Sequence, residues 1–421
     1  MHFWVLMMTD RKNSIVFSPC CIRKIELKNR IVRSATFENA ANVDGKVTEQ
    51  LIEIYHKLAK GGVGLIITGN VSVYSKAFTR HRVLGIYDDN FISGLKKISQ
   101  TVHDTDSECK IMVQLQHPGR QVLNPETLSK LNPYLPPAYL SYIKRHQEVI
   151  QSYQHPPHSV EPTAPSAIFD TLFEQTPRAL TLEEINEIIE SHAEGIRRAQ
   201  EAGFDGVQLH AAHGYLLSSF LSPWTNRRND KYGGSTENRI RIFDEIYEQA
   251  KKKVGEDFPI AIKMNTTDFL PGGMDLEEAT KVAEILSRTG FAAIETSGGM
   301  WEAVTAGREE LKWRPVLLPE SRTAIKTIDQ EAYFLPGAKA LKEKTDIPII
   351  LVGGLKTFDK IEGILESGSA DFVSLARPLI RQPDLPNLWL SDSSNNKAEC
   401  ISCNACLPIM EEPLKCRMKK S

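Results

Sequence analysis

Short runs of apolar residues recur eight times along the chain. Near-continuous hydrophobicity, in place of strict alternation with polar residues, is typical of strands that are covered on both faces. The runs are residues 31–34, 63–69, 110–116, 204–210, 259–265, 292–298, 348–354 and 370–376. We therefore predict eight buried strands that run parallel to one another.

Helical patterns lie between these runs, and the clearest covers residues 182–202. Its apolar positions recur with a period that keeps them on one face of a helix. Thr181 and Glu184 give a capping-box pattern at its start. Several patterns end on a glycine shortly before the next strand, which indicates a repeated helix stop. These glycines are Gly62, Gly203, Gly290 and Gly368.

Eight strands that alternate with helices predict an α/β fold, a (β/α)8 TIM barrel with long insertions after its strands. An open doubly wound sheet is the alternative, but its G-x-G-x-x-G turn does not follow the first strand. One insertion, residues 121–177, is rich in proline and aromatic residues, and a second long loop covers residues 299–332. Both follow the carboxyl ends of strands, where barrel enzymes carry their active sites. We expect the first insertion to be a cap or a partner surface.

The chain divides into an N-terminal extension (residues 1–13), the barrel (residues 14–390) and a short Cys-rich tail (residues 391–421). Lys and Arg total 51 against 53 Asp and Glu, and the net charge of -2 provides no basic surface for nucleic acid. The apolar start is too short for a signal or membrane segment, which predicts a cytoplasmic protein. The expected partners are small molecules or a second copy of the chain in a homo-oligomer.

The fourth apolar run leads into a polar segment with two histidines and a tyrosine, His210, His213 and Tyr215. Histidine supplies hydrogen-bond donors that polarise a carbonyl, and a phenol supplies a proton to a developing carbanion. Two other interpretations of the histidine pair stay open. The histidines would form half of a metal site, although no third ligand follows nearby, or they would be a purely structural pair.

Glycines and an arginine follow the seventh and eighth runs, at Gly353, Gly354, Ala376 and Arg377. Backbone donors with one cation at this place form the usual phosphate site of a barrel. Glycines that serve only tight turns are the alternative.

Several ordered segments resemble the Old Yellow Enzyme family of NAD(P)H:flavin oxidoreductases, from about residue 15 to residue 390. The matching segments are residues 27–36, 44–69, 113–121, 162–168, 176–185 and 352–386. The resemblance implies a barrel that binds FMN and takes electrons from NADH or NADPH. It also implies ene-reductase activity, the reduction of activated carbon-carbon double bonds in α,β-unsaturated carbonyl compounds.

The resemblance assigns roles position by position. His210 and His213 would hold the substrate carbonyl above the flavin, and His210 would also contact the cofactor. Hydride from flavin N5 would reach the β-carbon, and Tyr215 would protonate the α-carbon. Lys263 stands where many members carry an arginine near flavin N1, and Glu38 stands where some carry a tyrosine over the substrate. The other FMN-binding positions are Ser34, Ala35, Thr36, Gly69, Asn70, Gln114, Gly353, Gly354, Ala376 and Arg377.

Four cysteines crowd the tail with the spacing C-x2-C-x2-C-x9-C, namely Cys400, Cys403, Cys406 and Cys416. Thiolates in this arrangement suit an iron-sulfur cluster or a zinc ion. The tail resembles the segment after the barrel in dienoyl-CoA reductases and trimethylamine dehydrogenases, where four cysteines bind a [4Fe-4S] cluster. The last spacing is shorter here. A cluster, a zinc ion and no metal therefore remain three alternatives.

Three further functions stay open at this point. An amine dehydrogenase or dienoyl reductase would use an additional iron-sulfur cluster. A phosphate-binding barrel lyase or isomerase would need a Schiff-base lysine or a carboxylate base at a strand end, and Lys263 is the lysine at such a place. A flavin-binding protein without turnover is the third.

Overall fold

A computed structural model of the chain describes residues 11–75, 82–122, 161–303, 320–391, 394–407 and 412–418. All eight predicted strands form, each within or overlapping its apolar run. They are β3 (Ile31–Arg33), β4 (Leu65–Ser72), β6 (Lys110–Gln116), β9 (Gly206–Ala211), β10 (Ile260–Asn265), β11 (Ile294–Ser297), β12 (Ile349–Leu351) and β13 (Phe372–Leu375).

The eight strands form a closed parallel barrel, which confirms the predicted fold. The order β3-β13-β12-β11-β10-β9-β6-β4 is closed by the pairing of β3 with β4. A short ninth strand, β5 (Leu84–Gly85), pairs with the end of β4 outside the closed ring. The register of β4 on β6 shifts between Ile67 and Asn70, so Thr68 and Gly69 form an irregularity at the carboxyl end of β4.

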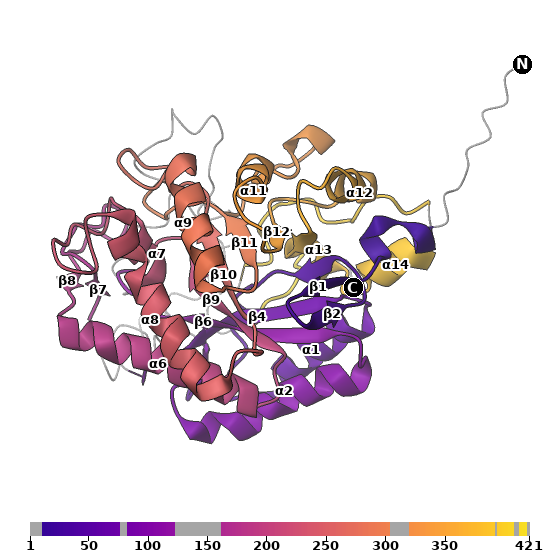
Figure 1. Cartoon of the computed structure of the whole chain (residues 1–421). Coiled ribbons are helices and arrows are strands. Elements are labelled where there is room, and N and C mark those ends of the chain that lie inside the picture. Colours follow the sequence, from indigo (N-terminus) through magenta and orange to yellow (C-terminus); the bar gives the residue numbers. More distant parts are fainter. Residues whose placement is uncertain are drawn as a thin grey trace, which may run out of the picture.

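Helices surround the strands on the outside of the barrel (Figure 1). One helix follows each strand in chain order: α1 (Glu49–Lys60), α2 (Ile92–Thr105), α6 (Leu182–Glu201), α8 (Thr236–Val254), α9 (Leu276–Thr289), α11 (Leu335–Lys342), α12 (Phe358–Glu366) and α14 (Leu385–Ser391). Two shorter helices, α7 (Leu216–Leu221) and α13 (Arg377–Arg381), follow the carboxyl ends of β9 and β13.

The helix boundaries follow the predicted signals. The backbone N–H of Glu184 donates to Thr181 Oγ1 (3.2 Å), and the backbone N–H of Thr181 donates to the Glu184 carboxylate (2.9 Å), so the capping box of α6 is formed. Gly290 ends α9 in the left-handed conformation, with φ of 110°. Gly62, Gly203 and Gly368 also have positive φ, a conformation that glycine adopts without strain.

The interior of the barrel is apolar at the end where the strands begin. Inward-facing side chains from the strands form one cluster with two residues of the hairpin β1 (Cys20–Ile22) and β2 (Ile25–Leu27), so this hairpin plugs the amino-terminal end. The buried members are Ile22, Leu27, Val32, Leu65, Ile67, Met112, Ala261, Ala292, Ala293, Ile350 and Phe372. A second, larger cluster fills the layer between strands and helices.

Two predicted segments fall largely outside the described residues. Residues 1–10 of the N-terminal extension are outside, and its last turn, η1 (Arg11–Asn13), is tied to α14 by a hydrogen bond from Arg11 Nη1 to the carbonyl of Trp389 (3.2 Å). Residues 123–160 of the insertion are outside, and the described part carries the short pair β7 (Thr163–Ala164) and β8 (Arg178–Ala179). Among the described residues, no helix combines the length and the hydrophobicity needed to cross a bilayer.

The apolar floor generates a stability prediction. Phe372 is fully buried inside the barrel, so Phe372→Ala would leave a cavity and lower the free energy of unfolding by about 3–5 kcal/mol. Denaturant titration followed by tryptophan fluorescence would measure the change. Val43→Ala is the control, because Val43 is 77% exposed and its truncation should leave the midpoint unchanged. Equal midpoints for both variants would contradict the assigned packing.

Candidate active site

Three side chains converge at the carboxyl end of β9. The ring centroid of His210 lies 5.1 Å from that of His213 and 4.9 Å from that of Tyr215. His210 belongs to β9, whereas Tyr215 caps the start of α7. His210 and His213 are each 6% exposed. The structure therefore brings together the three residues that the sequence singled out for catalysis.

His213 is held in a strained backbone conformation, with φ of 64°. A residue other than glycine in this region costs on the order of 1–3 kcal/mol, and such outliers concentrate at functional sites. Its backbone N–H donates to Asn265 Oδ1 (3.2 Å), and its Nε2 lies 2.7 Å from Ser297 Oγ. A residue of β10 therefore holds the backbone of His213, and a residue of β11 holds its imidazole ring.

Burial keeps both histidines neutral. It lowers the pKa of His210 to about 3, and the nearby ammonium of Lys263 adds to this effect. Burial, followed by the electrostatic effects of the neighbouring His210 and Lys263, holds the pKa of His213 well below its ordinary value. Burial also raises the pKa of Tyr215, as does the carboxylate of Glu320. At neutral pH the site thus offers two uncharged imidazoles and a protonated phenol.

A polar layer lies in the barrel between the apolar floor and the histidines. Lys263 Nζ lies 2.9 Å from Ser34 Oγ and 3.3 Å from Glu295 Oε1. Gln208 Nε2 donates to Glu295 Oε2 (2.9 Å), and Gln114 Nε2 donates to Gln208 Oε1 (2.8 Å). Three positions predicted to touch the cofactor, Ser34, Gln114 and Lys263, therefore belong to one buried network.

The loop after β3 and the carboxyl-terminal half of β4 carry the other predicted cofactor positions. The backbone N–H of Gly69 donates to the Glu38 carboxylate (3.1 Å), and a Cβ on Gly69 would collide with that carboxylate. Arg33 Nη2 also donates to Glu38 (2.9 Å). Glu38, which stands where some relatives carry a tyrosine over the substrate, is thus bonded to Arg33 and Gly69 in the barrel wall. Ala35, between Ser34 and Thr36, packs against the floor cluster, whereas Asn70 is bonded to Gln116.

The predicted phosphate position lies where β12 and β13 end. Gly353 and Gly354 have φ of 137° and 72°, and Cβ atoms there would meet Tyr333 and its neighbours. Ala376 precedes α13, which begins at Arg377. The Arg377 side chain contacts the tail, where Nη1 donates to Asn404 Oδ1 (2.8 Å), and the same Nη1 donates to the carbonyl of Arg322 (2.8 Å). This position therefore combines a glycine turn with the start of α13, and Arg377 also bonds to the tail.

A buried charge network forms one wall above the site. Arg120 Nε donates to Asp170 (3.1 Å), and Arg120 Nη2 donates to Glu302 (3.1 Å). Burial, and then the charge of Asp170, raises the pKa of Glu302 to about 7. Next to Glu302, the ring of Trp301 lies 6.2 Å from that of Tyr215 and 5.7 Å from that of Phe173. The network thereby joins the ends of β6 and β11 to the described part of the insertion.

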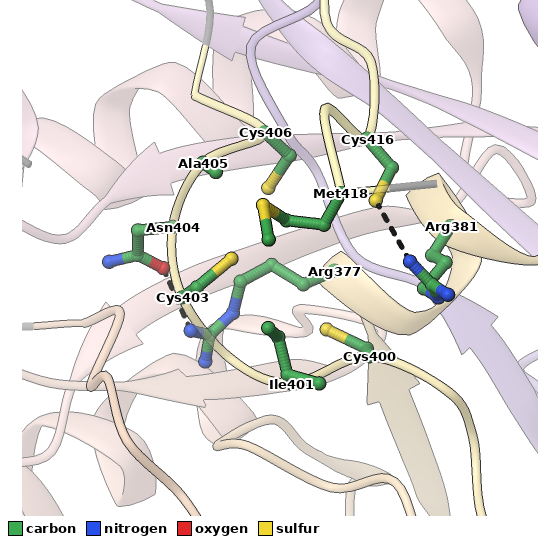
Figure 2. Close-up of a pocket in the computed structure, with 10 residues that line it drawn as sticks. All are labelled: Arg377, Arg381, Cys400, Ile401, Cys403, Asn404, Ala405, Cys406, Cys416 and Met418. Carbon is green, nitrogen blue, oxygen red and sulfur yellow. Dashed lines mark hydrogen bonds between the residues drawn. The ribbon is translucent and has the colours of Figure 1, made fainter. Parts of the chain in front are cut away.

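The four tail cysteines line one pocket together with Arg377, Arg381 and Met418 (Figure 2). Among the described residues, no group of three or more His, Cys, Asp or Glu side chains is placed to hold a single metal ion. A cluster, a zinc ion and no metal stay open as alternatives for the four cysteines.

The tail is docked on the barrel through backbone and amide contacts. The N–H of Leu414 donates to the carbonyl of Glu38 (2.8 Å), and the N–H of Ala324 donates to the carbonyl of Ser402 (3.1 Å). Asn404 Nδ2 donates to the carbonyl of Ser321 (2.8 Å). The cysteine pocket therefore adjoins the loop after β3 and the loop before α11.

Sequence reasoning missed four acidic residues of this region, Asp170, Glu295, Glu302 and Glu320. A carboxylate within an apolar run was the available signal for Glu295, in the run that ends at residue 298. The other three lie in or beside long loops without a motif. The carboxyl of Glu320 has a buried oxygen without a hydrogen-bond partner among the described residues, and burial raises the pKa of Glu320 to about 7.

Comparison with known sequences matches residues 15–388 to the NADH:flavin oxidoreductase / NADH oxidase family. An NADH oxidase from Thermoanaerobacter brockii is 35% identical over 92% of this chain and 52% of its own length. An NADPH dehydrogenase from Geobacillus sp. is 32% identical over 89% of this chain and 93% of its own length. The chain spans about half the length of the first of these relatives.

Comparison with solved structures finds the same fold. A complex of 2-naphthoyl-CoA reductase superposes with a TM-score of 0.76 at 25% identity, over 93% of this chain and 54% of the other.

The Arg120 network predicts a pH-dependent stability. The pKa of Glu302, about 7, exceeds its ordinary value of 4.5, so the folded state binds this proton more tightly than the unfolded state does. The contribution of Glu302 to the stability of the protein should therefore fall as pH rises from about 4.5 to about 7, and it should change no further above that range. In Glu302→Gln this loss is absent. Thermal unfolding from pH 5 to pH 8 should show the variant gaining on the wild type by on the order of 2 kcal/mol.

A constant difference between the two proteins over that pH range would contradict the assignment. Glu183→Gln is the matched control, because Glu183 is exposed on the first turn of α6 and its replacement should leave the pH profile of the wild type unchanged.

Proposed function

Because the chain belongs to the NADH:flavin oxidoreductase / NADH oxidase family, we propose that it is an FMN-dependent NAD(P)H oxidoreductase that reduces activated carbon-carbon double bonds. The observation that carries the proposal is the convergence of His210, His213 and Tyr215 over the polar layer of the barrel. Two neutral donors beside a protonated phenol are the groups that reduction of an enone requires.

The residues at the top of the barrel fit a flavin mononucleotide. His210 Nδ1 is buried without a hydrogen-bond partner among the described residues, which leaves it available to a ligand. Gln114 and Lys263 supply polar groups for the ring system, whereas Gly353, Gly354 and the backbone of Ala376 and Arg377 supply the phosphate end. Bound FMN would supply hydride chemistry, with NADH or NADPH as the source of electrons.

The proposed work of the protein's own side chains is positioning and proton transfer. The imidazoles of His210 and His213 orient the substrate carbonyl by hydrogen bonding and withdraw electron density from the conjugated alkene. Because both rings are neutral, they do so without releasing protons over the physiological range. The phenol of Tyr215, whose pKa is raised, holds its proton until the α-carbon becomes basic enough to take it.

Two features count against the lyase or isomerase alternative. A Schiff base needs an uncharged lysine, but Lys263 is paired with the buried carboxylate of Glu295, which stabilises its ammonium form. Both oxygens of Glu295 are also engaged by other side chains, so it is poorly placed to act as a free carboxylate base.

The four cysteines of the tail are the basis of a second proposal. We propose that Cys400, Cys403, Cys406 and Cys416 hold an iron-sulfur cluster. Support comes from the shared pocket and from the cationic side chains of Arg377 and Arg381 beside it, which would offset the negative charge of four thiolates (Figure 2). A dienoyl reductase or an amine dehydrogenase remains the alternative activity in that case, and an amine dehydrogenase would pass electrons to an external acceptor.

An anaerobic visible spectrum of the purified protein tests the main proposal. A flavin spectrum should be bleached by NADH or NADPH and restored by cyclohexenone. Tyr215→Phe should slow the restoring step by about 10²–10⁴-fold while leaving the bleaching step unchanged, because only the second step needs its proton.

Tyr232→Phe is the matched control, since this tyrosine is buried and its hydroxyl bonds Glu245 (2.6 Å), outside the site. Equal slowing of both steps in Tyr215→Phe would contradict the assigned role. A colourless protein that takes up no FMN would overturn the proposed function.

Iron and acid-labile sulfide, measured after anaerobic purification, test the tail. About four of each per chain are expected, with a broad brown absorbance beneath that of the flavin. Cys403→Ser should lose both, whereas Cys21→Ser, which alters an exposed cysteine of the basal hairpin, should keep them. One zinc per chain without sulfide would favour the zinc alternative instead.

A further inference from the structure

Lys263 and Glu295 form a buried ion pair across two neighbouring strands. They are direct partners in the register of β10 and β11, and Lys263 is also the register partner of His210 on β9. The side chain of Glu295 is fully buried, that of Lys263 is 6% exposed, and the charged atoms lie 3.3 Å apart. Lys263 and Glu295 thus belong to the same row of register partners as His210.

The surroundings of the pair keep the carboxylate ionised. Burial alone would raise the pKa of Glu295, but the ammonium of Lys263 and hydrogen bonds from Ser34 and Gln208 outweigh it and lower that pKa. Ser34 Oγ donates to Oε1 (2.6 Å), and Gln208 Nε2 donates to Oε2 (2.9 Å). Both carboxylate oxygens are therefore engaged, and the positive charge of Lys263 has a negative charge beside it.

A packing role alone does not call for this arrangement. A buried ion pair contributes little net stability compared with well-packed apolar side chains of similar volume. The floor of the same barrel uses such apolar side chains one layer below, at Met112, Ala261 and Phe372. Lys263, two residues after Ala261 on β10, and its partner Glu295 carry charge instead. This placement points to an electrostatic role toward a ligand.

We propose that Glu295 is a positioning residue that neutralises Lys263 and thereby holds bound FMN at a low reduction potential. The inference rests on the proposed function. A lone cation near the pyrimidine end of the ring would stabilise the negative charge of the reduced flavin, and an adjacent carboxylate cancels much of that field. The reduced cofactor is then a stronger reductant, which suits acceptors whose double bonds are only weakly activated.

The midpoint potential of the FMN-loaded protein, measured against reference dyes, tests the inference directly. Glu295→Gln removes the negative charge, keeps the shape and leaves Lys263 cationic. The potential should rise by at least about 30 mV, which corresponds to a tenfold change in the equilibrium constant of a two-electron couple. An unchanged or lowered potential would overturn the proposal.

Two double variants separate charge from structure. Glu295→Gln with Lys263→Arg carries a guanidinium that cannot lose its proton, so the potential should rise even if a solitary lysine became neutral. Glu295→Gln with Lys263→Gln has no net charge, as in the wild type, and should return to the wild-type potential. A rise of equal size in this neutral double variant would show that the charge of Lys263 is not responsible, and the proposal would fall.

These measurements distinguish the inference from the function on which it rests. A wild-type protein that binds no FMN would overturn both. A protein that binds FMN, is reduced by NADH or NADPH and keeps its potential in the charged double variant would overturn the inference alone. If Glu295→Gln does not fold by itself, because it leaves a buried charge unpaired, the neutral double variant, which leaves no charge unpaired, still tests the proposal: it should keep the wild-type potential, and a shifted potential would overturn the proposal.

Discussion

The closure of the sheet by β3 and β4 is the constraint on which the site depends. In a closed parallel barrel, every second side chain of each strand must point into the interior, and the strands are tilted against the barrel axis. Inward-facing side chains two residues apart on one strand therefore lie in successive layers of the barrel interior. Ala261, Lys263 and Asn265 on β10 pass in this way from the apolar floor, through the polar layer, to the level of the histidines.

Charges buried around this site occur in groups of different composition. Arg33 with Glu38 and Lys263 with Glu295 each pair one cation with one carboxylate. Arg120 instead faces two carboxylates, so one of them retains a proton up to about neutral pH. An uncompensated charge is costly away from water, and most charges of the protein here already have a partner. A charged group of a bound ligand would therefore find few opposite charges to pair with. The neutral histidines complete a site built for hydrogen bonding to uncharged oxygen.

The pattern of apolar residues was sufficient to predict the strands, because burial on both faces leaves a continuous signal. It was sufficient for α6 as well, where the period and the capping box agree. The buried carboxylates could not be predicted in the same way. Acidic residues are usually exposed, and the partner of Glu295 lies on another strand, 32 positions earlier in the numbering. Glu38 was assigned to the substrate by resemblance alone, but Arg33, the last residue of β3, pairs with its carboxylate in the barrel wall.

The docking of the tail ties the cysteine segment to the closed barrel. Leu414 and Ser402 bond to segments that are far apart in sequence, next to residues 38 and 324. These two segments are brought to one face of the molecule only when the first and last strands of the barrel have paired. The common pocket of the four cysteines therefore depends on the closed ring. A group held by these cysteines would have the folded barrel as its scaffold.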